Sequence, residues 1–238
     1  MKKLLPLAPR GNPIARAGPN RNRHTATVLR AENGPNTHMP AVEGTIMTLA
    51  DASTFTRRLD DLGVSVSAGP PSECAAMIDA AAGEPAVGVP LNRSGPDAFA
   101  DSPAGLPDRI ETDPTTADLR GAHTGVTAAS LGVAAYGSVA LEADPDGTEP
   151  VGLFVDRHVV VLREADLVPD MPDAFDWLGP RARDESVDVV FATGPSATAD
   201  MGGLVHGAHG PKEVHVVLLR DEDAADGSDA AVDAEDGQ

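Results

Sequence analysis

The 238-residue sequence contains very few cysteine, lysine and aromatic residues. Cys74 is the single cysteine, which excludes an intrachain disulfide and a cysteine-based zinc or iron–sulfur site within this chain. Aromatic residues make up 3% of the chain and hydrophobic residues 41%, so a core must be built mainly from valine, alanine and leucine. Cys74 falls in an expected helix, where we predict a buried small hydrophobic side chain rather than a reactive thiol.

Hydrophobic runs long enough to cross a membrane are also missing. The longest, at about Leu131–Leu141, is well short of the roughly 20 residues that a spanning helix needs. The apolar start of the chain is broken by Pro6 and ends before Arg10, so it falls short of a signal peptide. The sequence therefore predicts a cytoplasmic protein without a membrane partner.

Basic residues are scarce after the first 46 positions. Residues 1–46 carry seven basic and two acidic groups, whereas the remainder carries 11 basic and 35 acidic groups, a net charge of −24. Lys212 is the single lysine in that remainder. An acidic body with little lysine predicts a halophilic protein, with an ordinary acidic protein from a GC-rich genome as the alternative. This charge disfavours nucleic acid as a partner.

The composition of both ends predicts disorder. Residues 1–46 lack apolar periodicity and are rich in Pro, Gly, Asn and Arg, which indicates a disordered basic extension. A wrongly assigned start codon would explain it, because Met39 and Met47 both lie just before the first periodic segment; a nucleic-acid-binding arm is the alternative. Residues 221–238 carry eight acidic groups and no basic ones, which indicates an acidic disordered tail. The folded domain is expected over residues 47–220.

Helical and strand patterns alternate within this domain, which predicts an α/β fold with a mostly parallel sheet. A strand at Val64–Val66, a helix at Ser72–Ala82 and a strand at Ala86–Leu91 suggest two strands paired in parallel. The other expected elements are a helix over Phe55–Leu62, strands at Ser138–Glu142, Val159–Leu162, Val187–Ala192 and Glu213–Leu219, and a short helix at Asp173–Leu178 ended by Gly179-Pro180.

The strongest local signal for a binding site follows the expected buried strand at Val187–Ala192. The run Thr193-Gly194-Pro195-Ser196-Ala197-Thr198-Ala199-Asp200 combines glycine, hydroxyl groups and a carboxylate. Ligands favour the carboxyl edge of an open α/β sheet, so we predict a pocket there that binds an anion. Ordinary turn chemistry, with Ser196 or Asp200 capping a helix, is the alternative.

A second candidate segment runs from His206 to Glu213. His206 and His209 are three residues apart, but the neighbouring glycines argue against a helix and no third ligand is evident, so no metal site is predicted. A loop histidine acting as an acid or base is favoured instead, with His209 as the candidate. Lys212 is a candidate contact for an anionic ligand, and chance placement is the alternative.

Two further places are candidates for ligand binding. Gly137 and Ser138 precede an expected strand, and His158 lies between two apolar runs, a position more typical of a structural histidine. A nucleophile elbow, a Walker loop and a dinucleotide-binding fingerprint are all missing from the sequence. No cofactor is therefore expected in this chain.

Several of these segments together resemble the LUD domain of the LutC/YkgG lactate-utilisation family, over about residues 50–220. Gly194–Asp200 and Gly207–Leu219 are similar to the family's C-terminal signature, "GPS-x-TAD" followed by "G-x-HGP-x-x-(L/V)HV-x-L". His158–Val161 with Asp166–Pro169 resembles the family's central strand, and Gly137-Ser138 resembles the end of its "AETG(T/S)" element.

This chain departs from the family pattern beside one of those elements. Ala135 and Tyr136 stand where the family usually has Glu and Thr, and His206 stands where an aliphatic residue is common. An acid or base step through that glutamate therefore has no counterpart here.

The resemblance implies a three-layer sandwich like that of the NagB/RpiA/CoA-transferase superfamily. It also implies a subunit that supports oxidation of L-lactate to pyruvate together with iron–sulfur partner proteins, which would hold the clusters. The candidate catalytic residues are Asp200 and His209; the candidate ligand-binding residues are Gly137, Ser138, His158, Thr193, Gly194, Pro195, Ser196, Thr198, Gly210 and Lys212. Two alternatives stay open: a free-standing enzyme of the CoA-transferase or sugar-phosphate-isomerase type that binds an anionic ligand, and a non-catalytic interaction module.

Overall fold

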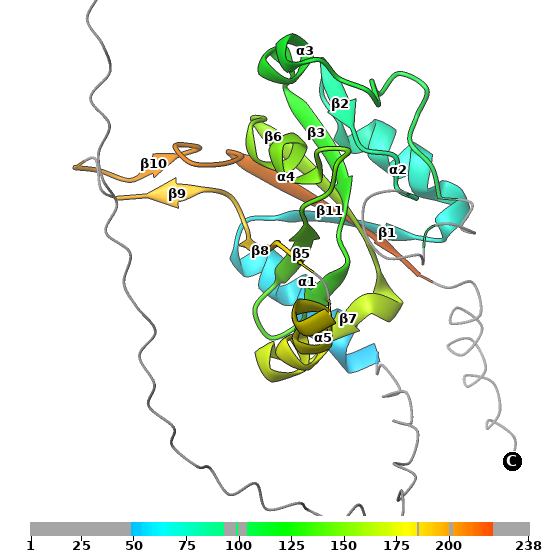
Figure 1. Ribbon diagram of the computed structural model, residues 1–238, viewed down its shortest axis with the longest axis vertical. Coiled ribbons are helices and arrows are strands. Elements are labelled where there is room, and N and C mark those ends of the chain that lie inside the picture. Colours follow the sequence, from blue (N-terminus) through cyan, green and yellow to red (C-terminus); the bar gives the residue numbers. More distant parts are fainter. Residues whose placement is uncertain (1–48, 93–98, 100–103, 185, 200–201, 221–238) are drawn as a thin grey trace, which may run out of the picture. The chain divides into compact units, whose positions relative to one another are not determined.

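The computed structural model describes residues 49–92, 99, 104–184, 186–199 and 202–220 (Figure 1). Its α-helices are α1 (Leu49–Asp61), α2 (Cys74–Ala81), α3 (Thr116–Gly121), α4 (Thr148–Leu153) and α5 (Met171–Asp184). Its strands are β1 (Ser65–Gly69), β2 (Ala86–Gly88), β3 (Thr124–Ala128), β4 (Leu131–Val133), β5 (Ser138–Glu142), β6 (Arg157–Arg163), β7 (Leu167–Val168), β8 (Val189–Thr193), β9 (Ala197–Thr198), β10 (Val205–His206) and β11 (Glu213–Leu219). The two terminal segments predicted to be disordered lie outside the described residues.

The central sheet, sheet A, has the strand order β1-β11-β6-β3-β2, and every neighbouring pair is parallel. This arrangement confirms the α/β class and the mostly parallel sheet. The expected pairing of β1 with β2 is wrong, because β11, β6 and β3 lie between them and place these two strands at opposite edges. Apolar patterns predict where strands occur, but they do not predict which strands pair, because strands from later in the chain can insert between two earlier ones.

Sheet A is covered on both faces. On one face, Val126, Val159 and Val217 pack against Cys74 and Ile78 of α2. On the other face, the alternate residues of the same strands pack against α1 and a second sheet; this core includes Phe55, Leu59, Leu141, Val160, Leu162, Val216 and Leu218. The layers therefore form an α/β sandwich around sheet A.

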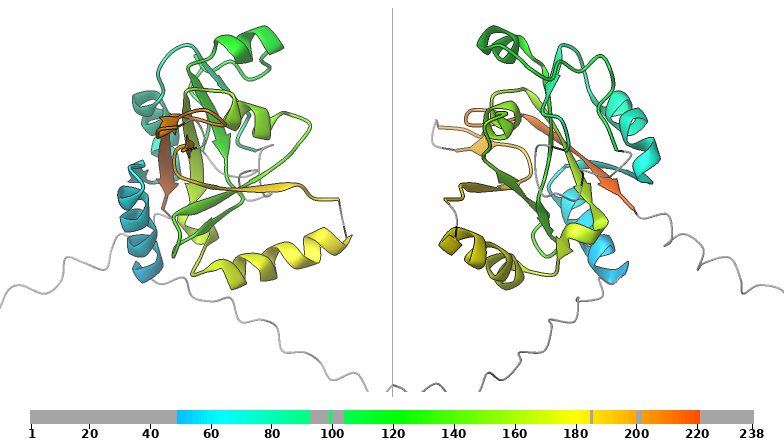
Figure 2. Two further views of the ribbon diagram at one scale, coloured as in Figure 1. Left: turned by 90° about the vertical axis from the view of Figure 1, so that its left-hand side faces the viewer. Right: turned by 45° about the vertical axis from the view of Figure 1, so that its right-hand side comes forward.

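The second sheet, sheet B, has the order β7-β4-β5-β8, with β5 antiparallel to both β4 and β8. Its outer face packs against α5, which lies at the end of the molecule away from α3 (Figure 2). The expectation of a buried strand at Val187–Ala192 needs correction, because β8 is a half-buried edge strand of this antiparallel sheet. Phe191 and Val189 face α5 rather than the centre of sheet A.

Helix α5 also differs from the sequence-based expectation. It runs through Gly179 and Pro180 to Asp184, whereas a stop was expected at that dipeptide. Arg181 bridges the proline: its guanidinium lies 4.3 Å from the Trp177 ring centroid and donates to the Trp177 carbonyl. Such contacts help to stabilise the turn that a proline weakens by removing one backbone donor.

The expectation for the single cysteine is met. Cys74 is fully buried in the core, and burial raises the pKa of its thiol to about 11, so it is a packing residue. Within the described part of the chain, no helix is both long and apolar enough to cross a membrane. The ribbon β9–β10 extends away from the two larger sheets, as Figure 1 shows.

Candidate functional site

A cavity of about 150 Å³ is lined by four strands, two helices and the chain that follows β8. Sheet A contributes β6 and β11, sheet B contributes β5 and β8, and α1 and α4 close the sides. The lining residues are Leu59, Val64, Gly137, Val139, Leu141, Gly152, Leu153, His158, Val160, Val190, Ala192, Gly194, Ser196, His209, Gly210, Pro211, Val214 and Val216. The structure thus places six of the sequence-predicted site residues around one cavity.

The cavity lies at the amino ends of β6 and β11, since His158 and Val214 are each the second residue of their strand. The sequence-based expectation was the carboxyl edge of the sheet. It was wrong because β8 belongs to sheet B and runs antiparallel to β5, so its carboxyl end does not lie at the carboxyl edge of sheet A.

Gly137, Ser138, Thr193 and Gly194 come together although they derive from two distant segments. Ser138 pairs with Thr193 across sheet B, and their hydroxyl oxygens are 2.7 Å apart. The flanking glycines have φ values of +65° and +69°, and a Cβ on either one would lie 3.2 Å from Leu62 of the chain after α1. Both positions therefore require glycine, because the positive φ is unfavourable for other residues and because a side chain would crowd Leu62. Both glycines line the cavity, and the two hydroxyls bond each other beside it.

Ser196 organises the segment that forms one wall of the cavity. Its backbone N–H donates to the Pro211 carbonyl at 2.8 Å, and its carbonyl accepts from the Gly207 N–H at 2.8 Å. Its Oγ accepts from the His209 N–H at 3.3 Å. A Cβ on Gly210 would lie 3.2 Å from the Ser196 Cβ, so the two halves of the segment are in close contact. The segment thus brings Ser196 and the exposed His209 to one wall.

His158 lies deep in the cavity wall and is 3% exposed. Its Nε2 is 2.9 Å from Oγ1 of Thr127, a fully buried residue of β3. Gly152 of α4 covers the ring, since a Cβ there would approach the imidazole to 2.9 Å. Burial lowers the pKa of His158 to about 4, so the ring is neutral at pH 7.

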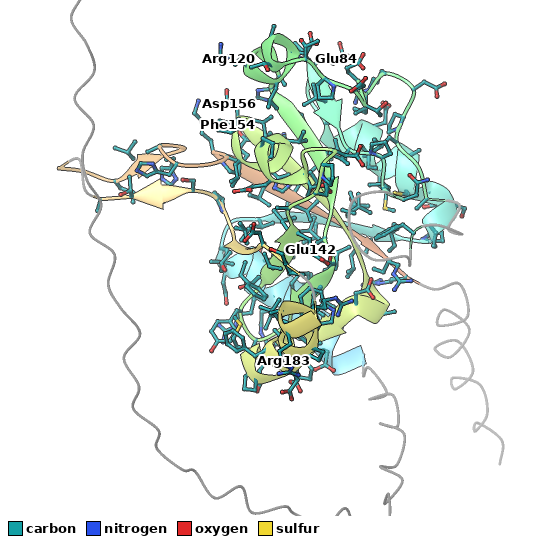
Figure 3. The ribbon with its side chains drawn as sticks, viewed as in Figure 1. Glu84, Arg120, Glu142, Phe154, Asp156 and Arg183 are labelled. Atoms are coloured by element: carbon teal, nitrogen blue, oxygen red, sulfur yellow. The ribbon has the colours of Figure 1, made fainter. Side chains whose placement is uncertain are left out.

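Lys212 lies outside the cavity lining. Its ammonium is 2.8 Å from a carboxylate oxygen of Asp156, and its backbone N–H donates to the Asp156 carbonyl. The hydrogen bond from Lys212 lowers the pKa of the Asp156 carboxyl, with a smaller contribution from His123. Figure 3 shows Asp156 close to Phe154, on the chain between α4 and β6. Lys212, just before β11, thus contacts Asp156, just before β6, and helps to hold the starts of these two strands together.

The other candidate residues are spread around the site. Pro195 sits between two lining residues, and Thr198 is in β9, paired with Val205 of β10. His206 is exposed in β10. Asp200, one of the two candidate catalytic residues, lies outside the described residues.

The cavity wall is mostly aliphatic, and its lining contains no lysine, arginine, aspartate or glutamate. Its side-chain hydrogen-bonding groups are the imidazoles of His158 and His209 and the hydroxyl of Ser196. No group of three or more His, Cys, Asp or Glu residues that could hold a metal occurs among the residues that the structure describes. Such a site suits a small ligand that is partly apolar and bears a few oxygen atoms.

Sequence reasoning missed Thr127 and Gly152, which hold His158 in place. A signal for Thr127 was present, because a threonine within an apolar strand pattern needs a hydrogen-bond partner once it is buried. No local pattern identifies that partner, since Thr127 and His158 are 31 residues apart.

The depressed pKa of His158 predicts acid sensitivity. The unfolded chain takes up this proton near the ordinary pKa of 6.5 and the folded chain only near 4, so stability is full above about pH 6.5 and is lost as the pH falls toward 4. The loss is about 2–3 kcal/mol in the free energy of unfolding, measured by denaturant titration in molar KCl. His158→Gln is expected to reduce it.

His215 is the matched comparison, because burial and, to a lesser extent, Arg157 also lower its pKa. His215 is only half-buried, so His215→Gln should reduce the acid loss by less than His158→Gln does. Equal pH dependence in wild type and His158→Gln would contradict the prediction.

Comparison with known proteins gives one family and one solved structure. The family model described as the LUD domain matches residues 72–219. The crystal structure of a DUF162 family protein from Deinococcus radiodurans is similar, with a TM-score of 0.51 at 19% sequence identity, covering 71% of this chain and 96% of that chain. That likeness supports the fold alone. No curated protein matches this sequence.

Proposed function

The chain belongs to the LUD domain family, and on that premise we propose that it is a LutC/YkgG-like subunit supporting the oxidation of L-lactate to pyruvate. Iron–sulfur partner proteins would carry the electrons. The fold would be the NagB/RpiA/CoA-transferase-like form of the α/β sandwich.

One observation carries this proposal: the segments that resemble the family signature are the ones that surround the cavity. Gly194 and Ser196 come from the first half of that signature, and His209, Gly210 and Val214 come from the second. The cavity volume of about 150 Å³ suits a ligand of about six non-hydrogen atoms, since a cavity of that size accommodates benzene. L-lactate and pyruvate both have six.

Electron transfer is assigned to partners because of the cysteine content. Removing two electrons from lactate requires an acceptor, and typical iron–sulfur clusters are held by four cysteine thiolates. This chain has one cysteine, the first residue of α2, and its side chain is buried in the core. Exposed aromatic side chains, including Phe154 and Phe175, would give partner proteins a surface to bind.

Deleting the gene from the source organism tests the proposed function. We expect the deletion strain to lose growth on L-lactate and to grow normally on pyruvate, because pyruvate enters metabolism after the proposed step. A tagged copy of the full chain should restore growth and should copurify with cysteine-rich iron–sulfur proteins from lactate-grown cells. Normal growth of the deletion strain on L-lactate would reject the proposal.

Variants of the tagged copy test whether growth on L-lactate depends on the residues that line the cavity. His209→Ala, Ser196→Ala and Asp200→Asn are expected to restore growth poorly. His206→Ala is the matched control, because His206 is in the same segment but is outside the cavity lining. Growth of His209→Ala and Ser196→Ala at the wild-type rate would remove these residues from the mechanism.

A further inference from the structure

The buried pair of Thr127 and His158 determines which nitrogen of the imidazole carries the proton. Thr127 is fully buried, and its hydroxyl has the Nε2 of His158 as its partner, at 2.9 Å. Among the described residues, no other side-chain acceptor is recorded for that hydroxyl, so its proton goes to Nε2; a buried hydroxyl proton without an acceptor is costly. A neutral imidazole that accepts at Nε2 must carry its own proton on Nδ1.

Close backbone packing holds the ring in this state. A Cβ on Gly125 would lie 2.0 Å from the Val151 carbonyl oxygen, so α4 is in direct contact with β3. Gly152, the next residue of α4, rests against the imidazole. Together with the Thr127 hydrogen bond, this contact restricts rotation of the ring and keeps Nε2 directed at Thr127.

We infer that His158 is a specificity-determining residue that donates a hydrogen bond from Nδ1 to the C2 oxygen of a short 2-oxo acid, and that the site prefers 2-oxo acids over 2-hydroxy acids. The ring lines the cavity and Nε2 is taken by Thr127, so Nδ1 is the polar atom that the ring offers to a ligand. This inference rests on the proposed function and identifies pyruvate, the product, as the better ligand.

The preference follows from the donor character of the site. A ketone oxygen only accepts hydrogen bonds, which matches an N–H donor in an aliphatic wall. A hydroxyl oxygen can also accept from Nδ1, but its own proton then faces valine and leucine side chains. The carboxylate would lie at the mouth, near the Ser196 hydroxyl and the exposed His209, where water still solvates it.

Isothermal titration of the full chain in molar KCl with pyruvate, L-lactate and propionate tests the inference. We expect pyruvate to bind roughly tenfold more tightly than L-lactate, because lactate leaves a hydroxyl proton unpaired. Propionate, which has no C2 oxygen, should also bind more weakly than pyruvate. Equal or tighter binding of L-lactate, or no binding of pyruvate, would overturn the inference.

Two variants of β3 provide a matched pair. Thr127→Val removes the group that fixes the tautomer and should abolish the preference for pyruvate, whereas Thr127→Ser should retain it. Thr124→Val is the control, since the Thr124 hydroxyl is equally buried but has no hydrogen-bond partner in the described structure. Loss of the preference in Thr124→Val as well would show that the effect is not specific to His158.

A measurement on wild-type protein avoids any dependence on folding of the variants. Nitrogen-15 NMR of the histidine side chains at pH 7 should show His158 protonated at Nδ1 and unprotonated at Nε2. Protonation at Nε2 would overturn the inference. A pyruvate preference together with normal growth of the deletion strain on L-lactate would leave the inference standing and reject the lactate-oxidation role.

Discussion

Replacing Gly125 by alanine is expected to lower the free energy of unfolding by about 3 kcal/mol and to abolish pyruvate binding. Gly125 is buried in β3, and an added Cβ would lie 2.0 Å from the backbone oxygen of Val151 and 3.0 Å from its carbonyl carbon. A flexible side chain could turn away, but this neighbour is the backbone of α4. Helix α4 would have to move off β3, which separates Gly152 from the imidazole of His158.

Thermal unfolding in molar KCl measures this effect, and a loss of about 3 kcal/mol corresponds to about 6–12 °C for a domain of this size. Gly121→Ala is the matched control, because a Cβ on this exposed residue of α3 meets nothing within 4 Å. Its melting temperature should be unchanged or slightly raised, since alanine favours helix. A Gly125→Ala protein as stable as Gly121→Ala would show that α4 does not need this close approach.

The elements that the sequence predicted best are those whose pattern reflects burial directly. The expected strands at Ser138–Glu142 and Glu213–Leu219 have the bounds of β5 and β11. In both, a run of buried residues makes the strand stand out from its polar neighbours. The helix after Ser72 was equally clear, because its apolar residues recur at helical spacing over the core.

Strand pairing was the part that sequence patterns did not determine. The run of β1, α2 and β2 looks like one unit, yet three strands from later in the chain lie between β1 and β2. Sheet B was missed for a similar reason, because the small residues around Gly132 give no clear alternation. A Cβ on Gly132 would lie 2.6 Å from both Leu162 and Leu167, so glycine there permits the two sheets to pack closely.

The candidate site shows the same division between local and long-range information. Glycine and hydroxyl composition directed attention to Gly137, Gly194 and Ser196, and the structure places all three around the cavity. Their functional roles stay predictions. The hydrogen bond that positions His158 comes from Thr127, and no local sequence pattern connects these two residues. The edge of the sheet at which the cavity lies could not be predicted either, because the sequence does not show that β8 pairs antiparallel with β5.

The net charge leads to the second large expected effect: the melting temperature should rise by about 10 °C or more between about 10 mM and about 1 M KCl. The chain from residue 47 onward carries 35 acidic and 11 basic groups, a net charge of −24. Over this range of salt the screening length falls from about 30 Å to about 3 Å, so repulsion between the carboxylates is largely removed.

Salt also weakens the attraction between oppositely charged side chains. The number of such ion pairs decides whether added salt raises or lowers the melting temperature. The described pairs include Arg109 with Asp79, Arg157 with Glu213, and Lys212 with Asp156, each with at least one well-exposed partner. Pairs of this kind contribute about 0–1 kcal/mol each. With 11 basic groups against 35 acidic groups, most carboxylates have no cation to attract, so relief of repulsion outweighs the loss of pairing.

A triple variant, Asp60→Asn, Asp108→Asn and Asp188→Asn, tests whether charge causes the salt effect. These three exposed aspartates lie in different parts of the described chain. The substitutions therefore reduce the net negative charge without concentrating the change in one region. The variant should melt at a higher temperature than wild type in dilute buffer and gain less from KCl, because less repulsion is left to screen. A melting temperature of the wild-type protein that stays constant from dilute buffer to molar KCl would contradict adaptation to high salt.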